Sequence, residues 1–427
     1  MIDHAKKWRF AKEAYTGTGG FENGKYIDRY TRENDDKFER RKKSAYYSNL
    51  FAQKVQRYIG YLYRKPPVRT ASNDLIRLIF DDADMRGNSA DVFFSSFAAE
   101  AKVRGAGLLL VDMPKEIPGS LAEQKATRAV PFFRFIEPER VTAYKLDRLG
   151  RLEYVRFDDV IDNSTPDEHE VLQVTRHYDT NGWEVLDGDD VIESGEHGLG
   201  VCPVLAFGER GDFPDIGEFT QVADLAKRHY NLKSELDEIL RSQTFSILTF
   251  NGNPADTEIK LSTENAIFYP KDHDRPGFIS PESGPAKIYQ EEITATESMI
   301  NRVCYDIDTT QGAESGIALE IKFQGLNGSL GNFAMRMEDL EARAFDIAAK
   351  YLGITDDVTI SYPREFHILD VPKEIETLEA IKGLGYNLPT YEAAKLKRIV
   401  QNDLGGVDDE TMEKIGAEIE DGLKLAE

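Results

Sequence analysis

The residue types that could bind a metal or a phosphate form weak patterns in this sequence. Asp272, His273 and Asp274 are the best metal-binding candidates, but three adjacent side chains cannot all turn toward one ion without strain. They are better interpreted as solvated residues of a turn. The segment 19–26 nearly matches a P-loop, but a tyrosine stands where a Ser or Thr hydroxyl should meet magnesium, and no strand precedes it. The sequence therefore predicts no metal and no cofactor.

The candidates for covalent or acid–base catalysis are equally weak. Ser315 lacks the glycine two positions earlier that a nucleophile elbow needs, and it is better placed as the N-cap of a helix. Cys304 falls on the apolar face of its helix and is predicted to lie in a core. Carboxylate pairs such as Asp189 with Asp190 carry little weight in so acidic a chain. We expect no catalytic residues, and one rival remains open: an acidic intracellular hydrolase that uses a carboxylate pair.

Composition narrows the classes of protein. A chain of 427 residues with 41% hydrophobic and 30% charged residues predicts a globular protein of two or three domains. No apolar run approaches the roughly 18 residues of a membrane span, and the N-terminus lacks a signal core. Two cysteines favour a reducing compartment. The net charge of −23 argues against a surface that grips phosphates, although a negative wall would let DNA slide past.

A long helix is predicted over Ala318–Gly353. Its apolar positions alternate in steps of four and three, which is typical of a helix with one buried seam: Leu326, Leu330, Phe333, Met337, Leu340, Ala344, Ile347 and Tyr351. The charged residues between them, Glu341 included, are expected on a solvated face. Three glycines soften the start of this helix, each costing about 1 kcal/mol relative to alanine. The element is either a rod that bends or approaches a partner there, or a kinked core helix.

The first half of the chain predicts an irregular arm, helices, a buried strand and then a β-rich region. The expected elements are an arm over 1–35, helices over 36–64, 75–80 and 90–104, and a strand over 107–112. The basic run 40–43 is expected to be a solvated face, with docking to an acidic partner as the alternative. Residues 131–208 alternate short apolar runs with turn signals, which predicts an antiparallel meander with an acidic mobile loop over 158–170.

The second half predicts a stalk with a tip. Two amphipathic helices, 218–244 and 287–308, flank a β-rich insert over 245–286. The long helix follows, then a strand over 358–362. Residues 372–427 are acidic and predict three short helices broken by glycines.

The order of these parts resembles the portal proteins, the head-to-tail connectors of tailed bacteriophages. The stretches that carry the likeness are Arg104–Pro114 (RGAGLLLVDMP), Phe135–Val141 (FIEPERV), Ala223–Asn231 (ADLAKRHYN) with Ser234 after it, and Glu314–Leu319 (ESGIAL) with the long helix behind it. Together they span about residues 36 to 420.

The resemblance implies an α+β, portal-type fold with a mixed α/β wing, a two-helix stem, a small β-rich clip and a helical crown. Carried over by position, the parts are an N-terminal irregular arm (1–35), a wing (36–217), a first stem helix (218–244), a clip (245–286), a second stem helix (287–308), a tunnel loop with a long kinked helix and a wing strand (309–371), and a crown (372–427).

The resemblance also implies a loop near the start of the long helix that projects into a tunnel and meets DNA. Two segments compete for this role. The favoured one, because glycine permits bending and close approach, consists of Gln324, Gly325, Leu326, Asn327, Gly328, Ser329, Leu330, Gly331 and Asn332. The alternative consists of Thr309, Thr310, Gln311 and Gly312. Lys227 and Lys233 are the stem cations that could offset the negative charge locally, although each could equally be a solvated residue or an inter-subunit ion pair.

The function that the resemblance implies is a structural channel. A ring of about twelve copies would sit at a capsid vertex of a virion assembled in the host cytoplasm, away from any membrane. Double-stranded DNA would enter through it during packaging and leave through it at ejection. The expected partners are further copies of the chain, the major capsid protein, a terminase and a head-tail adaptor.

Overall fold

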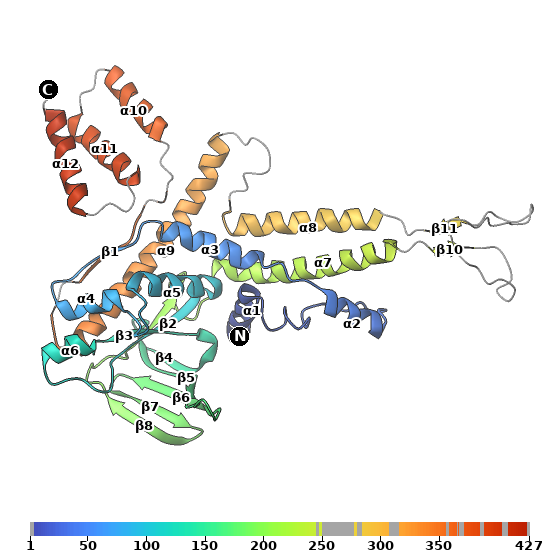
Figure 1. Ribbon diagram of the computed structural model, residues 1–427, viewed down its shortest axis with the longest axis horizontal. Helices are drawn as coiled ribbons and strands as arrows, with labels where there is room; N and C mark the ends of the chain where they lie inside the picture. The colour runs from blue at the N-terminus through green and yellow to red at the C-terminus, as the bar shows by residue number, and fades with distance from the viewer. Residues whose placement is uncertain are drawn as a thin grey trace, which may run out of the picture.

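The computed structural model describes most of the chain in ten segments: residues 4–244, 247–249, 277–279, 284–306, 316–355, 358–364, 366, 371–384, 388–403 and 409–424. Figure 1 shows a body built around two sheets, a rod of two helices that projects from it, and a group of helices at the C-terminus. The mixture of helix and sheet confirms the α+β class.

The N-terminal part is more helical than the sequence suggests. Its helices are α1 (His4–Thr16), α2 (Asp35–Ser44), α3 (Leu50–Leu62), α4 (Asp74–Asp81), α5 (Ala90–Arg104) and α6 (Leu121–Thr127). The expectation of an irregular arm is wrong for α1, which buries Trp8, Ala11 and Ala14 and donates from Trp8 Nε1 to the Asp215 carbonyl at 2.9 Å. A single helix over 36–64 is also wrong, because Asn49 accepts a hydrogen bond from the Ala52 N–H and starts a new helix.

The ends of α5 match the prediction for 90–104. Ser89 caps its first turn by accepting from the Val92 N–H. Gly105 ends it with a φ of 79°, a left-handed conformation that glycine adopts without strain. A side chain at Gly105 would also collide with the backbone of Gly217, so the body and the start of the rod touch here. This contact fixes where the rod leaves the body.

Two antiparallel sheets form the rest of the body. The first has the order β3-β2-β9, with β2 (Ala106–Asp112) buried between β3 (Phe132–Ile136) and β9 (Val204–Gly208). The second is a meander in sequence order: β4 (Val141–Leu146), β5 (Leu152–Asp162), β6 (Val171–Asp179), β7 (Gly182–Asp187) and β8 (Asp190–Glu196). The meander was expected to begin at residue 131 and instead begins at β4. The strand β8 was not predicted.

The predicted loop over 158–170 is partly strand, since β5 continues to Asp162. Buried and exposed residues alternate along this part of β5, and Asp159 occupies one of the buried positions. That carboxylate is buried but bound by Arg134 and Arg176, with Arg176 Nε at 2.6 Å. Burial would raise the pKa of Asp159, and the two guanidinium groups more than reverse this and lower it. A carboxylate of this acidic run can therefore be buried because arginines of β3 and β6 pair with it.

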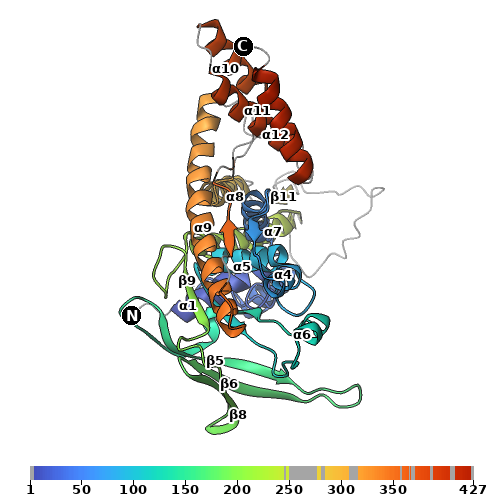
Figure 2. The ribbon, with the colours of Figure 1, turned by 90° about the vertical axis from the view of Figure 1, so that its left-hand side faces the viewer.

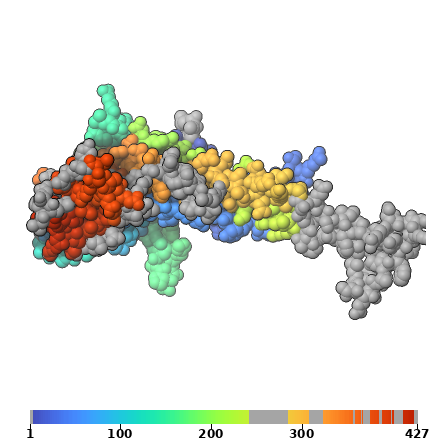
Figure 3. All heavy atoms as spheres, turned by 90° about the horizontal axis from the view of Figure 1, so that it is seen from above, coloured from blue at the N-terminus to red at the C-terminus, as the bar shows by residue number. Residues whose placement is uncertain are grey.

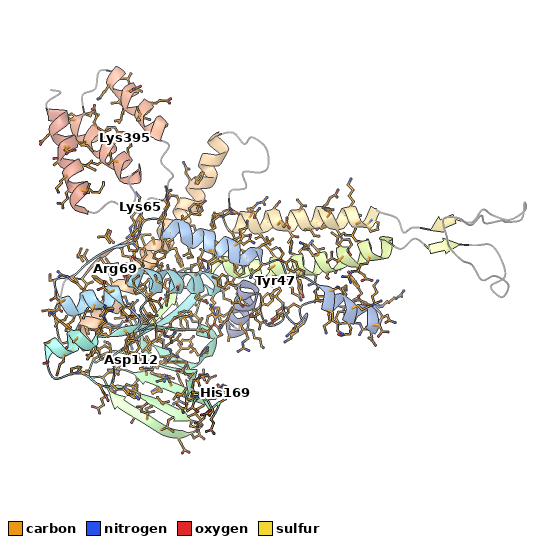
Figure 4. All side chains as sticks on the ribbon, in the orientation of Figure 1. Tyr47, Lys65, Arg69, Asp112, His169 and Lys395 are labelled. Atoms are coloured by element: carbon orange, nitrogen blue, oxygen red, sulfur yellow. The ribbon has the colours of Figure 1, made fainter. Side chains whose placement is uncertain are left out.

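The helix α9 (Gly316–Tyr351) packs against β2, β9 and α3, and Figure 2 shows it running from the sheets toward the C-terminal helices. The predicted apolar seam is confirmed, because every position from Leu326 to Ile347 in it is buried. Glu341 was expected to be solvated, and this is wrong. It is fully buried and accepts hydrogen bonds from Arg69, which Figure 4 labels in the body, and from the Tyr362 hydroxyl at 2.7 Å.

The remaining elements complete the outline. The rod consists of α7 (Val222–Thr244) and α8 (Gly284–Val303). Beyond it, β10 (Ile247–Thr249) pairs antiparallel with β11 (Gly277–Ile279), while most of the predicted β-rich insert, residues 250–276, lies outside the described residues. The short strands β1 (Val68–Thr70) and β12 (Thr359–Ser361) pair with each other. The single turns η1 (Pro138–Arg140) and η2 (Glu218–Gln221) precede β4 and α7. The C-terminal helices α10 (Val371–Gly383), α11 (Pro389–Asp403) and α12 (Asp409–Lys424) agree with the three that were predicted.

Candidate functional site: the stem, its base and the long helix

The stem, as we name the pair α7 and α8, is held together by a buried seam and by ion pairs. Ile293, Thr296 and Ile300 are the buried residues of α8. Arg228 on α7 pairs with Glu292 on α8 at 2.7 Å, and His229 Nε2 lies 2.9 Å from Glu297. Figure 1 shows α8 returning toward the body antiparallel to α7, and these pairs join the two helices side by side.

The N-terminal segment covers another face of α7. Arg41 is 1% exposed, and its guanidinium donates to Glu33 Oε1 at 2.9 Å, to Ser234 Oγ at 3.0 Å and to the Asp28 carbonyl at 2.6 Å. The side-chain hydrogen bond from Arg41 lowers the pKa of Glu33. The basic run 40–43 was expected to be solvated, and for Arg41 this is wrong, because its pairing with Glu33 makes burial affordable.

A buried cation marks the base of the stem. Lys102 of α5 is almost fully buried, and its ammonium pairs with Glu209 and with Glu218 Oε2, the latter at 3.1 Å. The ammonium also lies 4.4 Å from the Tyr58 ring centre and 4.3 Å from that of Phe219. Burial alone would lower the pKa of Lys102, and the surrounding carboxylates raise it above its ordinary value. Burial raises the pKa of Glu209.

Glu218 connects this cation to three other elements. Its carboxylate accepts a hydrogen bond from the Tyr305 hydroxyl, just beyond the end of α8, and lies 3.4 Å from the Ser329 Oγ of α9. Ser329 Oγ is in turn 3.0 Å from the Tyr58 hydroxyl of α3. The turn η2 just before α7, the residues just after α8 and the long helix α9 therefore share one polar network.

A cleft of about 890 Å³ opens beside this network. It is lined by Glu209, Arg210, Gly217, Glu218, Gln221, Tyr305, Ser329, Asn332, Phe333, Met335, Arg336 and Asp339. Its walls carry both signs of charge and come from the stem base and from α9. A change in the position of α9 relative to the stem would alter this cleft directly.

The far end of α8 is anchored to α3 by Asp306. Its carboxylate pairs with both Lys54 and Arg57. Burial would raise the pKa of Asp306, but the hydrogen bonds and charges of the two cations outweigh it and lower the pKa. The network at Glu218 and the two ion pairs of Asp306 together hold the C-terminal end of α8 on the body.

Replacing Asp306 with asparagine is expected to lower the free energy of unfolding by about 2 kcal/mol at pH 7, since Lys54 loses its partner and Arg57 can still reach water. A lowered carboxyl pKa adds stability above the unfolded-state pKa of about 3.9, and that stability is lost as the pH falls through the folded-state value. Chemical denaturation between pH 2 and 7 should therefore show a shallower acid loss in Asp306→Asn. The exposed Asp346→Asn is the control, and an equal effect there would contradict the prediction.

The structure places the favoured tunnel segment in a helix and not in a loop. Residues 324–332 lie within α9, whose hydrogen-bonding pattern is continuous. Leu326 and Leu330 are buried in the core, whereas the opposite face of the segment is exposed at Gln324, Gly328 and Asn332. Asn327 accepts from the Phe366 N–H at 2.9 Å. Only the exposed face remains available to DNA or to another chain.

The other predicted site residues have varied outcomes. Lys227 is tied to Asp28 at 2.9 Å, while Lys233 forms no ion pair with the described residues. The alternative tunnel segment, 309–312, and the metal candidates, 272–274, lie outside the described residues. Among the residues that are described, no three His, Cys, Asp or Glu side chains gather into a possible metal site, and no helix could cross a membrane.

One cleft that could serve the rival hydrolase, of about 460 Å³, lies between β2 and the edge of the meander, where Asp112 lies (Figure 4). Asp112 Oδ2 accepts from the Tyr178 hydroxyl at 3.1 Å, and burial raises the pKa of this carboxyl. Glu193, at the same cleft, is paired with Lys115. Asp112 thus links β2 to β6, and Glu193 links β8 to the segment after β2. Both carboxylates have contacts that are typical of structural side chains.

Sequence reasoning missed the network at the stem base, although one signal was present. Phe94, Ala98 and Lys102 recur at four-residue spacing, which puts the lysine on the buried face of α5. A lysine on an apolar helical face predicts a buried partner of opposite charge. The partners themselves are more than 100 residues away along the chain, and no local pattern identifies them.

No protein-family model and no curated protein matches this sequence. Solved structures do match in outline, and two of them come from gene transfer agent particles. One is from the neck of a native gene transfer agent (GTA) particle computed with C12 symmetry, at a TM-score of 0.38 and 10% identity over 86% of this chain and 90% of that chain. The other is from the virion of a native gene transfer agent particle, at a TM-score of 0.39 and 10% identity over 91% of this chain and 98% of that chain. With TM-scores below 0.5, the function has to be argued from this chain's own residues.

Proposed function

We propose that the chain is a portal protein, which assembles into a ring around a channel at a capsid vertex, and that double-stranded DNA passes through this channel during packaging and ejection. The stem forms the narrow part of the ring, and β10 and β11 form part of the clip at its tip. The body forms the wing, and α10, α11 and α12 form the crown. The role is structural, with no catalytic residue of its own.

The observation that carries this proposal is the uncovered outer face of α8. Ile288 is 61% exposed and Met299 is 52% exposed. They are eleven residues apart, which is three helical turns, so both lie on one exposed side of α8, about 100° around the helix axis from the buried seam. Figure 3 shows the α8 atoms, in yellow, along the upper surface of the stem. Exposed apolar side chains along the projecting stem favour a partner that runs along the length of the stem.

A ring of identical copies would supply that partner. Each stem would cover the outer face of its neighbour, and closure of the ring would leave no stripe exposed. The net charge of −23 suits a conduit, because a negative wall repels the DNA backbone and lets it move. The exposed face of 324–332 on α9 is the part of the chain that we assign to the tunnel wall.

The partners follow from these positions. The clip would dock the terminase during packaging and a head-tail adaptor afterwards, and the wing would meet the major capsid protein. The ring would assemble in the host cytoplasm and remain in the virion.

The mass of the purified particle tests the proposal. We expect rings of about 580 kDa if twelve copies of the 48.2 kDa chain assemble, visible as annuli by electron microscopy. Mass photometry or light scattering would measure this at several protein concentrations. A dispersed monomer at high concentration would overturn the proposal. A monomer that also hydrolyses ester or glycosidic substrates, and loses this activity in Asp112→Asn, would favour the rival hydrolase.

A further inference from the structure

The two partners of α7 lie on nearly opposite sides of it. Residues that contact the N-terminal segment are Lys227, Asn231, Ser234 and Glu238, which recur every three or four positions and share one face. Arg228 and His229, which contact α8, point about 140° away around the helix axis at 100° per residue. Figure 1 agrees, with α8 above α7 and α2 below it. The stem region is thus a slab in the order α2, α7, α8.

The two outer surfaces of this slab differ in chemistry. The outer face of α8 carries Ile288 and Glu291, whose side chain is 66% exposed and whose carboxylate lies 3.9 Å from the ammonium of the exposed Lys287. On the outer face of α2, Arg40 and Lys43 are exposed and form no ion pair with the described residues. Tyr46, 69% exposed, follows directly. The α8 surface offers an aliphatic side chain beside a carboxylate that has one loosely held lysine partner, and the α2 surface offers cations beside an aromatic ring.

These two surfaces also lie at the same height along the stem. Arg41 donates to Ser234 and Lys37 pairs with Glu238, so α2 runs antiparallel to α7 and Arg40 and Lys43 lie near the level of Ser234. On the other side, the pairs Arg228–Glu292 and His229–Glu297 bring residues 286–292 of α8 level with Ser234, because the helices are antiparallel. Ile288 and Glu291 fall within that interval.

Equal height matters because copies in a closed ring are related by rotation alone. Rotation about the ring axis moves nothing along that axis, so surfaces that meet between stems parallel to it must start at the same level. We propose that the outer face of α8 in one copy packs against the outer face of α2 in the next, with Glu291 facing Arg40 and Lys43, and Ile288 against Tyr46. This inference rests on the proposed ring and specifies a head-to-tail contact within it.

Charge reversal tests the contact. Lys43→Glu places a carboxylate opposite Glu291 of the neighbour and is expected to raise the concentration for half-assembly at least tenfold, measured by mass photometry across a dilution series. Glu291→Lys should have a similar effect, and the double variant Lys43→Glu with Glu291→Lys should restore assembly. Arg148→Glu, at an exposed cation between β4 and β5, makes the same charge change outside the stem and should leave assembly unchanged. Each chain's circular dichroism spectrum confirms that it folds.

Crosslinking tests the geometry independently of affinity. Cysteines at positions 43 and 291 in one chain, joined by a short bis-maleimide, should give a ladder of dimers, trimers and longer products on a denaturing gel. A two-fold contact would stop at the dimer, because both links would join the same two copies. The natural Cys202 and Cys304 are buried, so the unmodified chain and the two single variants are expected to give no ladder.

The outcomes separate this inference from the proposed function. Rings that form normally in Lys43→Glu, with no crosslinked ladder in the double-cysteine chain, would overturn the α8–α2 contact and leave the ring standing. An unmodified chain that stays monomeric at high concentration would overturn both. A dimer without longer products would replace the head-to-tail contact with a two-fold one and so contradict it.

Discussion

Replacing Lys102 with methionine is expected to lower the free energy of unfolding by about 3 to 5 kcal/mol at neutral pH, the usual cost of removing one partner from a buried ion pair. Methionine fills a similar volume among the rings of Tyr58 and Phe219, so the loss is electrostatic more than steric. The carboxylate of Glu209 would remain buried without its cation. Denaturant unfolding monitored by tryptophan fluorescence would measure the change.

The pH dependence of Lys102→Met gives a second readout. Burial already raises the pKa of Glu209, and loss of the neighbouring cation would raise it further. A carboxyl whose folded-state pKa is raised binds its proton more tightly when folded, so stability falls as the pH rises from the unfolded-state value of about 4.3 through the folded-state one. The loss in free energy of unfolding caused by Lys102→Met should therefore be smaller at pH 5 than at pH 8.

Two variants control this prediction. Lys145→Met removes an exposed lysine from a surface pair with Glu153 and should change stability by less than about 0.5 kcal/mol. Adding Glu209→Gln to Lys102→Met removes the stranded charge and should recover a large part of the loss. A deficit that is independent of pH and is not relieved by Glu209→Gln would show that packing, and not charge, is what Lys102 contributes.

The same kind of long-range pairing limits what the sequence can predict. The seam of α9 was predictable because helical periodicity is local, and its positions are buried as expected. Glu341 lies between those positions and was placed on the solvated face by the same periodicity. Its burial depends on Arg69, which is 272 residues away along the chain, and periodicity carries no information about such a partner.

The candidate site shows the same division. The two stem helices were predictable from their amphipathic patterns, and α7 ends at the predicted residue 244. The position of the N-terminal segment was not predictable, because its packing on α7 depends on the hydrogen bond from Arg41 to Ser234, two residues far apart in the sequence. The three glycines of α9 favour a loop in the sequence, but the buried Leu326 and Leu330 keep the segment helical.

Replacing Gly325, Gly328 and Gly331 together with alanine is expected to leave rings intact and to abolish DNA packaging, if our assignment of this face to the tunnel wall is right. No contact with the described residues requires glycine at these positions. A methyl group at Gly328 would meet no atom within 4 Å, and at Gly325 its nearest neighbour would be Tyr305 Cε1 at 3.8 Å. The alanines should therefore stabilise the isolated chain by about 1 kcal/mol each.

A sequence that forgoes this stability at three positions in one helix suggests a constraint from outside the subunit. Three methyl groups would add bulk to this face of α9 and make its backbone less flexible. In the proposed ring, this face passes close to DNA or to the next copy. Packaging into purified capsid precursors with the terminase, scored as nuclease-protected DNA, would measure the effect. Gly422→Ala in α12, where a methyl group also meets no atom within 4 Å, is the matched control. Full packaging by the triple variant would remove residues 324–332 from the tunnel wall, whereas failure to form rings would assign the glycines to contacts between copies.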